Sequence, residues 1–276
     1  MQGGGGRGIK SMDAAHFERI AELRNSGHLE EAIRESQILL KETSDINEKA
    51  SLLTGIGVLY SALGRLKEGH QTLDQLKRLP ISDVEVLLNA ELCEPALLIQ
   101  AGRYQEGLAA LGAMLDRHSG AFKEERFRYL YEDIQCRRAL TLFGLSRFRE
   151  ALPILQEAIS FSFSQVTDEQ QIHFALGVCL EEAKDAKAAR QEFIRVVSFG
   201  LRNDIEERSL YRLAILHYKA GALAQARQQL ETILRDFPNQ SAAVSRKQVY
   251  EALAQTSHYL NDKANEKLYM DLAKRA

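Results

Sequence analysis

Apolar residues recur every three or four positions along most of the chain. The stretch GVLYSALGRLKEGHQTLDQL, residues 57–76, contains two such runs separated by a Gly-Arg pair. This spacing places the apolar side chains on one face of an α-helix. Ala, Leu, Glu, Gln and Arg fill the stretches between the glycines, and all five favour helices. Because no stretch alternates Val, Ile and Thr as a strand would, the sequence predicts an all-α fold.

The helix–turn–helix pattern repeats along the sequence. Six turn residues align, at intervals of 37 to 44 residues, and a small residue follows each turn five positions later. A glycine in the turn can end the first helix with a positive φ, and the small residue lets the second helix pack closely. Such repeats predict helix pairs that stack and cover one another's apolar faces. The turn residues are Gly27, Gly64, Gly102, Ser146, Lys184 and Gly221, and the small residues are Ala32, Gly69, Gly107, Ala151, Ala189 and Ala226.

The repeated unit resembles the tetratricopeptide repeat. The chain departs from that family in having no tryptophan, and its intervals exceed the usual length of about 34 residues. The resemblance implies a right-handed superhelical solenoid of stacked antiparallel helix pairs, with about six repeats and a C-terminal capping pair. The unit that starts at Glu207 matches the family best, through Leu210, Leu213, Ala214, Gly221, Leu223, Ala226, Leu230, Ile233 and Pro238.

The alignment also predicts the domain organisation. Units start near residues 13, 50, 88, 132, 170 and 207, a cap follows from about residue 242, and residues 13–276 form a single domain. Residues 1–12 include MQGGGGRGIKS, which approaches a phosphate-binding loop. However, Lys10 comes one residue late, and no strand precedes Gly3 to hold such a loop rigid. We interpret residues 1–12 as a flexible glycine-rich tail.

Three local departures from the repeat carry predictions of their own. Pro95 falls inside the first helix of the third unit and should kink or shorten it. The longest interval gains its extra residues near HSGAFKEERFRYLYED, which we interpret as an N-terminally lengthened first helix of the fourth unit. In the C-terminal pair, which turns at Asn261, we expect Leu268 and Leu272 to face inward and lysines to face solvent.

Composition narrows the classes of partner. The chain has 276 residues and a formal net charge of -2, so it lacks the broad basic field that is typical of nucleic-acid-binding proteins. It has no apolar run of about 18 residues, which argues against a membrane span, and no apolar segment of a secretory signal. Cys93, Cys136 and Cys179 are widely spaced without a C-x-x-C motif. This argues against disulfides and structural zinc and favours the reducing cytoplasm.

The sequence offers no catalytic constellation. Paired carboxylates are adjacent on predicted helices, about 100° apart, and therefore do not face each other. The seven histidines form no H-E-x-x-H motif, and His173 and His217 occupy ordinary packing positions. Cys93 and Cys136 fall on the inner side of first helices, yet a free cysteine is more often a small buried hydrophobe. We therefore expect no enzyme activity, no metal and no cofactor.

The family resemblance implies that ligands lie on a concave surface lined by the first helices of the repeats. Here that surface is more apolar than solvent contact requires, and apolar patches with Arg and aromatic residues are typical of interaction sites. A tight superhelix, in which these side chains pack on each other, stays open as an alternative. The candidate partner-binding residues are Leu92, Ile99, Arg137, Leu140, Phe143, Phe174, Val178, Arg208, Tyr211, Arg212, Ile215 and Tyr218.

Arg208 and Arg212 lie four residues apart at the start of a first helix, where they could hold a carboxylate of a partner. Family members that clamp chaperone C-termini have a basic pair at these two places, with Lys and Asn on the first helices before. Here those places hold Cys136, Leu140 and Ala175, so we exclude that particular function. Alternatively, the two arginines could form ion pairs with Glu206 or Asp204 of the same helix.

These observations favour a non-enzymatic interaction scaffold that binds a peptide or helix of a partner protein. The alternative hypothesis is a regulatory or sensor solenoid of a signalling or transcription system, although no DNA-binding motif accompanies it. An open apolar groove would favour the scaffold, and polar groups converging in a closed pocket would favour the sensor. Assembly into a homo-oligomer is left open by the sequence.

Overall fold

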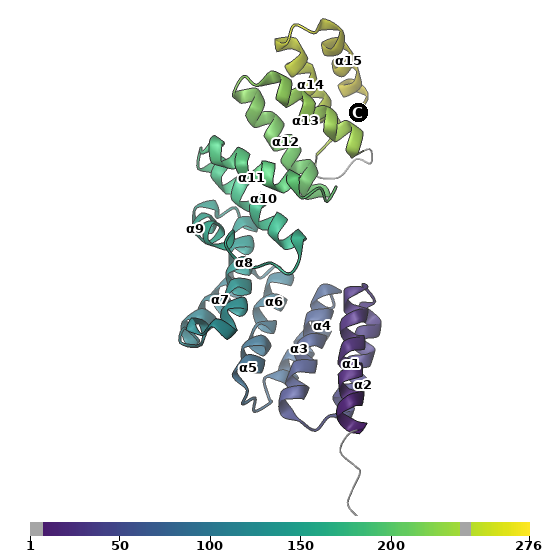
Figure 1. Cartoon of the computed structure of the whole chain (residues 1–276), viewed down its shortest axis with the longest axis vertical. Helices are drawn as coiled ribbons and strands as arrows, with labels where there is room; N and C mark the ends of the chain where they lie inside the picture. The colour runs from purple at the N-terminus through teal and green to yellow at the C-terminus, as the bar shows by residue number, and fades with distance from the viewer. Residues whose placement is uncertain (1–7, 238–243) are drawn as a thin grey trace, which may run out of the picture. The chain divides into compact units, whose positions relative to one another are not determined.

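The computed structural model describes residues 8–237 and 244–276, with side chains described from residue 15 onward. Every element in these ranges is an α-helix or a short 3-10 helix, which confirms the all-α prediction (Figure 1). The α-helices are α1 (Gly8–Asn25), α2 (Leu29–Glu42), α3 (Ile46–Ala62), α4 (Leu66–Leu76), α5 (Val84–Glu91), α6 (Cys93–Gln100), α7 (Tyr104–Arg117), α8 (Arg128–Gly144), α9 (Phe148–Ala158), α10 (Val166–Glu182), α11 (Ala186–Ser198), α12 (Asp204–Lys219), α13 (Leu223–Asp236), α14 (Arg246–Tyr259) and α15 (Lys263–Arg275).

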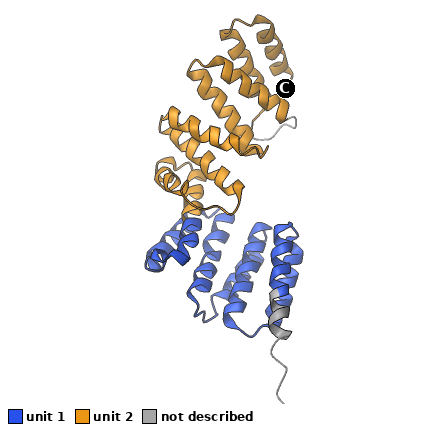
Figure 2. Ribbon diagram, in the orientation of Figure 1, with its two compact units in different colours: residues 1–134 blue, residues 135–276 orange. Residues whose placement is uncertain are grey.

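By its contacts the chain divides into two compact units, residues 1–134 and residues 135–276 (Figure 2), and the single domain over residues 13–276 stays a prediction. The division falls inside α8. In a repeat fold each helix packs mainly on its neighbours in sequence, so contacts do not tie distant parts of the chain together. Of the predicted tail, residues 1–7 lie outside the described residues, and residues 8–12 belong to α1. Pro238 and residue 242, the expected start of the cap, also lie outside the described residues.

In unit 1, α1 packs on α2, α3 on α4, and α6 on α7. The first helix of the third pair is broken at Leu92 into α5 and α6, as Pro95 predicts, because proline cannot donate the backbone hydrogen bond that would continue the helix. Apolar side chains of successive pairs form the core, for example Ala50, Leu53, Leu73, Leu76, Ala90 and Leu97.

The extra residues before the fourth pair do not lengthen its first helix, which corrects the prediction. They form two short 3-10 helices, Ala121–Lys123 and Glu125–Phe127, and α8 then starts at Arg128 with 17 residues, as many as α10. Phe127 is fully buried against Leu88 and Leu111. Burying this ring anchors the insert on the core, which explains why it folds as a compact turn rather than as a helical extension.

In unit 2, α10 packs on α11, α12 on α13 and α14 on α15, and each pair also contacts the next (Figure 1). Capping side chains define several helix starts: Asn203 accepts a hydrogen bond from the Glu206 N–H, and Ser245 and Gln248 form a capping box. Asp83 caps α5 by accepting a hydrogen bond from the Val86 N–H, whereas α10 starts at Val166 without a side-chain cap.

The turns confirm the repeat alignment. All six aligned turn residues have a positive φ, between 58° at Ser146 and 81° at Gly27, and Asn261 repeats the geometry in the C-terminal pair. The small residues lie where second helices pack closely: Ala151 and Ala189 are fully buried, and a Cβ on Gly69 would lie 2.5 Å from Leu97 Cδ2. A larger side chain at these positions would separate the helices.

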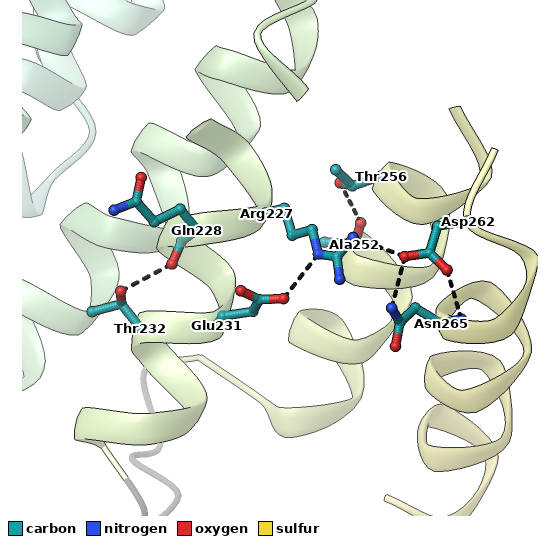
Figure 3. A network of polar contacts seen from close by, with 8 residues as sticks. All are labelled: Arg227, Gln228, Glu231, Thr232, Ala252, Thr256, Asp262 and Asn265. Carbon is teal, nitrogen blue, oxygen red and sulfur yellow. Dashed lines mark hydrogen bonds and ion pairs between the residues drawn. The ribbon is translucent and has the colours of Figure 1, made fainter. Parts of the chain in front are cut away.

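The C-terminal pair is fixed to the pair before it by a polar network (Figure 3). Arg227 on α13 contacts Glu231 Oε1 and Asp262 Oδ2, each at 2.9 Å, and Asp262 also accepts hydrogen bonds from the backbone N–H and the side chain of Asn265. Asp262 thereby caps α15 and joins it to α13. On α15, Leu272 is half-buried, but Leu268 is 50% exposed, which corrects the expectation that it faces inward.

Candidate functional site

Among the described residues, charged and aromatic side chains suited to binding a partner lie on α10, α12 and α14 of unit 2. Each of these is the first helix of its pair. We call the surface they share the first-helix face, defined by Glu181, Arg208, Tyr211, Arg212, Ile215, Tyr218, Glu251, Gln255 and Tyr259. Contacts between successive helices make it continuous. Arg212 on α12 pairs with Glu181 on α10, and Tyr218 on α12 contacts Tyr259 on α14 with ring centroids 5.7 Å apart.

The two arginines of α12 have different environments. The Arg212 guanidinium is 2.7 Å from Glu181 Oε2, so its charge is already paired with the preceding helix. The Arg208 guanidinium lies over the ring of Phe174, 4.8 Å from its centroid, in a cation–π contact. Among the described residues, Arg208 has no carboxylate within ion-pairing distance, and its side chain is exposed. A charge held on a ring without a counter-ion is suited to an incoming carboxylate.

The alternative pairing of these arginines with Glu206 or Asp204 is not what the structure has. The Glu206 carboxylate instead accepts a hydrogen bond from the Arg202 backbone N–H at 2.8 Å and is buried at the start of α12. That contact satisfies a backbone donor in the loop before the helix.

Two tyrosines supply the apolar part of the face. Burial raises the pKa of Tyr211, and the negative charge of Glu251 raises it further. Burial also raises the pKa of Tyr218, together with a hydrogen bond to Tyr259. Both phenols therefore stay neutral at physiological pH and present an aromatic ring with a polar tip, a combination favoured in protein interfaces.

Other candidate residues lie elsewhere. Phe174 and Val178 are 3% and 4% exposed, so they belong to the core and offer a partner almost no surface. Phe174 packs between Phe143 and Phe193, in an aromatic cluster that supports Arg208 from below. In unit 1, Leu92 and Ile99 are half-buried against the core around Leu88. On α8, Arg137 is exposed, and Leu140 and Phe143 are half-buried.

The sequence analysis missed the contribution of α14, because it treated the last pair only as a cap. The signal was present. Aligning Asn261 with the turn residue Gly221 places Glu251 and Gln255 at the same positions as Tyr211 and Ile215. Lysines lie close to these positions in the sequence, which is a pattern typical of a solvated end.

Titratable groups elsewhere are engaged in packing. His173 is buried between α10 and α11, with Nδ1 2.6 Å from Glu192 Oε2. Burial, assisted by the negative charge of Glu182, raises the pKa of the Cys179 thiol to about 11, so the nucleophilic thiolate is scarce at neutral pH. Within residues 8–237 and 244–276, no group of three potential metal ligands comes together. Over the same part of the chain, no helix is long and apolar enough to cross a bilayer.

Stacked helix pairs with a continuous face on their first helices define the class of helical-repeat proteins. Within that class, two tetratricopeptide repeat models match residues 136–199 and residues 208–239. None of the curated proteins matches the sequence. The chain is a tetratricopeptide repeat protein, as its turn, small-residue and apolar positions predict.

Solved structures of similar fold agree with this assignment. PilF from Pseudomonas aeruginosa shares 14% identity at a TM-score of 0.61, over 83% of this chain and 92% of that chain. The C-terminal part of a repeat protein from Cytophaga hutchinsonii shares 13% identity at a TM-score of 0.61, over 92% of both chains. A tetratricopeptide repeat protein from Parabacteroides merdae shares 13% identity at a TM-score of 0.52, over 95% of this chain and 92% of that chain. At such identities the likeness concerns the fold alone.

Proposed function

We propose that this protein is a non-enzymatic interaction scaffold that binds a segment of a partner protein on the first-helix face. One observation carries the proposal: Arg208 holds an exposed positive charge over Phe174, without a carboxylate partner among the described residues. Tetratricopeptide repeat proteins generally mediate protein–protein interactions, which supports a peptide or helix as the ligand.

The surroundings of Arg208 narrow the chemistry of the bound segment. Tyr211 lies about one turn after Arg208 on the same helix, and Ile215 lies about two turns after it. Both are half-buried and offer apolar contact area. Arg is favoured at interface centres when its charge is desolvated together with a carboxylate, and tyrosine contributes area at a low entropy cost. The segment we propose therefore carries an acidic side chain, or a free C-terminal carboxylate, next to an apolar one.

Two further elements belong to the proposal. Cys93, Cys136 and Cys179 do not form disulfide bonds with one another, which supports a reducing compartment such as the cytoplasm. The near-neutral formal net charge of -2 supports a protein rather than a nucleic acid as the partner.

The test is affinity capture from native lysate with Arg208→Ala combined with Tyr211→Ala. We expect the double variant to lose the proteins that the wild-type chain retains, while its far-ultraviolet circular dichroism stays unchanged. A photo-crosslinking amino acid at position 215 should then attach to a segment that contains an acidic residue.

The matched control is Arg235→Ala, which removes an exposed arginine from the second helix of the same pair, where it pairs with Asp236. It should leave capture intact, because α13 does not contribute to the first-helix face. Equal capture by the wild type and the double variant would move the binding site away from this face.

A further inference from the structure

A pocket of about 320 Å³ lies in unit 1, between the C-terminal parts of the second helices α4 and α7 and beside the broken first helix of the third pair. Its lining comes from α4, from residues 77–83 that connect α4 to α5, and from α5, α6 and α7. All of the lining residues belong to unit 1. The pocket is therefore separate from the first-helix face, whose residues lie in unit 2.

The break in the first helix explains why this space stays open. In a pair with an unbroken first helix, such as α12 with α13, the two helices pack directly on each other. In the third pair, α7 packs mainly on α6, whereas α5 packs mainly on α3. Space is therefore left beside the C-terminal half of α7, where Ala110 and Ala113 present only small side chains.

The interior of the pocket is apolar. Buried residues from four helices form its walls, namely Leu73, Leu76, Ala90, Pro95 and Met114. Leu79 and Ile81, in the connection between α4 and α5, are half-buried and also line it. Water is held weakly in an apolar space of this kind, so an apolar ligand enters without having to displace well-bound water.

The charged lining residues are paired with one another. Lys77 Nζ is 2.8 Å from Glu94 Oε2, and Arg117 Nη1 is 2.8 Å from Glu91 Oε2, which His118 Nε2 also contacts at 3.0 Å. The exposed side chains of Lys77 and Arg117 place these pairs at the opening. A charged ligand would have to separate one pair or approach a like charge, whereas an uncharged ligand leaves both pairs intact.

The volume of the pocket sets the size of the ligand. At about 30 Å³ for each non-hydrogen atom, close to the share of one molecule in liquid water, the pocket holds about ten carbon atoms. A linear hydrocarbon chain supplies them without polar groups, and its free rotation lets it follow walls contributed by four helices. A tryptophan side chain of a partner has a similar size, but its buried N–H needs an acceptor, and both carboxylates of the lining are paired at the opening.

We propose that the pocket between α4 and α7 binds an uncharged alkyl or acyl chain of about ten carbon atoms. The chain lies against Leu76, Ala90 and Met114, and the polar end of the ligand remains beside the two ion pairs at the opening. This binding uses unit 1 alone and does not depend on the function proposed above.

The test is isothermal titration calorimetry of the full chain with 1-alkanols from hexanol to dodecanol. Each added methylene group should tighten binding about fourfold, equivalent to about 0.8 kcal/mol, for as long as it fits into the pocket. The affinity should stop rising near decanol, because further methylene groups stay in water.

Two further ligands distinguish the sources of such a chain. The uncharged lipid 1-decanoylglycerol, below its micelle-forming concentration, should bind as tightly as decanol. The fatty acid decanoate should bind at least about threefold more weakly than decanol, because its carboxylate would stay close to Glu91 and Glu94. Tighter binding of decanoate than of decanol would contradict an uncharged ligand.

Substitutions in α7 test the site itself. Ala110→Phe places a ring in the pocket and should weaken decanol binding at least about tenfold. Ala109→Phe adds the same ring at the neighbouring exposed position, which does not line the pocket, and should leave binding unchanged. Ala113→Phe is a second blocking variant, because Ala113 lines the pocket from an exposed position where a larger side chain does not disturb the core.

Arg208→Ala with Tyr211→Ala should leave decanol binding unchanged, which separates this test from that of the proposed function. Three results would overturn the proposal. The first is absent decanol binding, or an affinity that keeps rising to dodecanol, since the alkanols would then only partition onto the surface. The second is decanol binding that survives both Ala110→Phe and Ala113→Phe in folded variants. The third is tighter binding of N-acetyltryptophanamide than of decanol, which would identify a partner's tryptophan as the occupant.

Discussion

At the residue scale, the environment of a side chain decides its role more than its identity or spacing does. Arg208 and Arg212 lie one turn apart on the same helix, yet Arg212 is neutralised by Glu181 and Arg208 rests on an aromatic ring. The sequence predicted a pair with one shared purpose. Only the neighbouring helix α10, which supplies both the carboxylate and Phe174, separates the two roles. A partner carboxylate would therefore find one available charge here rather than two.

The raised pKa of Cys179 predicts how the stability of the protein depends on pH. The unfolded thiol ionises near pH 9, whereas burial, with a contribution from Glu182, raises the pKa of the folded thiol to about 11. The folded state retains its proton longer, so this group stabilises folding below about pH 9, and the contribution is lost as the pH rises toward 11. Its slope is at most about 1.4 kcal/mol per pH unit.

The measurement is urea unfolding of the wild type and of Cys179→Ala at pH 8 and pH 10.5. The free energy of unfolding should fall more steeply with pH for the wild type, because tyrosines titrate equally in both proteins. Identical pH dependence in the two proteins would show that Cys179 is not buried as the structure has it.

At the element scale, the distance between paired helices is set by small residues at fixed positions. Two glycines of α7, Gly107 and Gly112, allow the effect of close packing to be distinguished from the effect of helix propensity. A Cβ on Gly107 would lie 2.6 Å from Ile99 Cγ1, whereas a Cβ on Gly112 would meet nothing within 4 Å. Both positions are inside the helix, so alanine gains about 1 kcal/mol of helix propensity at either.

Gly112→Ala should therefore stabilise the protein, and Gly107→Ala should lose that gain to overpacking. We expect the second variant to be less stable than the first by about 1–3 kcal/mol in thermal or urea unfolding. Equal stabilisation by both substitutions would mean that α6 and α7 can move apart without cost, contrary to the role given to the small residue.

At the scale of the whole molecule, the described helices contact mainly their neighbours in sequence, so stability is a sum of local terms. The loss of stability caused by a core substitution should therefore be confined to the helices next to it. Phe193 is fully buried on α11, with its ring centroid 6.1 Å from that of Phe174 on α10. Truncating such a ring typically costs about 3–5 kcal/mol.

For Phe193→Ala, hydrogen exchange followed by mass spectrometry should show faster exchange in α10, α11 and α12. Exchange in α3 and α4 of unit 1 should change little. A uniform increase along the chain would indicate a single cooperative domain instead of a chain of neighbouring contacts.

Most of the fold could be predicted from the sequence because its determinants are local. Turn residues such as Gly221 need only their own backbone conformation, and Pro95 breaks a helix through its own ring. The compact insert before α8 could not be predicted, because the fate of Phe127 depends on Leu88 and Leu111, which are distant in the sequence. For the same reason Phe174 was predicted on a surface, whereas the rings of Phe143 and Phe193 enclose it.

The sequence by itself determined the all-α class, the register of the repeats and the family, since helical periodicity, turn conformation and small residues act within one helix pair. Tertiary structure alone decided which side chains remain available to a partner, namely Arg208 but not Arg212. The physical reason is that exposure and charge pairing arise between helices, where the neighbouring pair either covers a position or leaves it open.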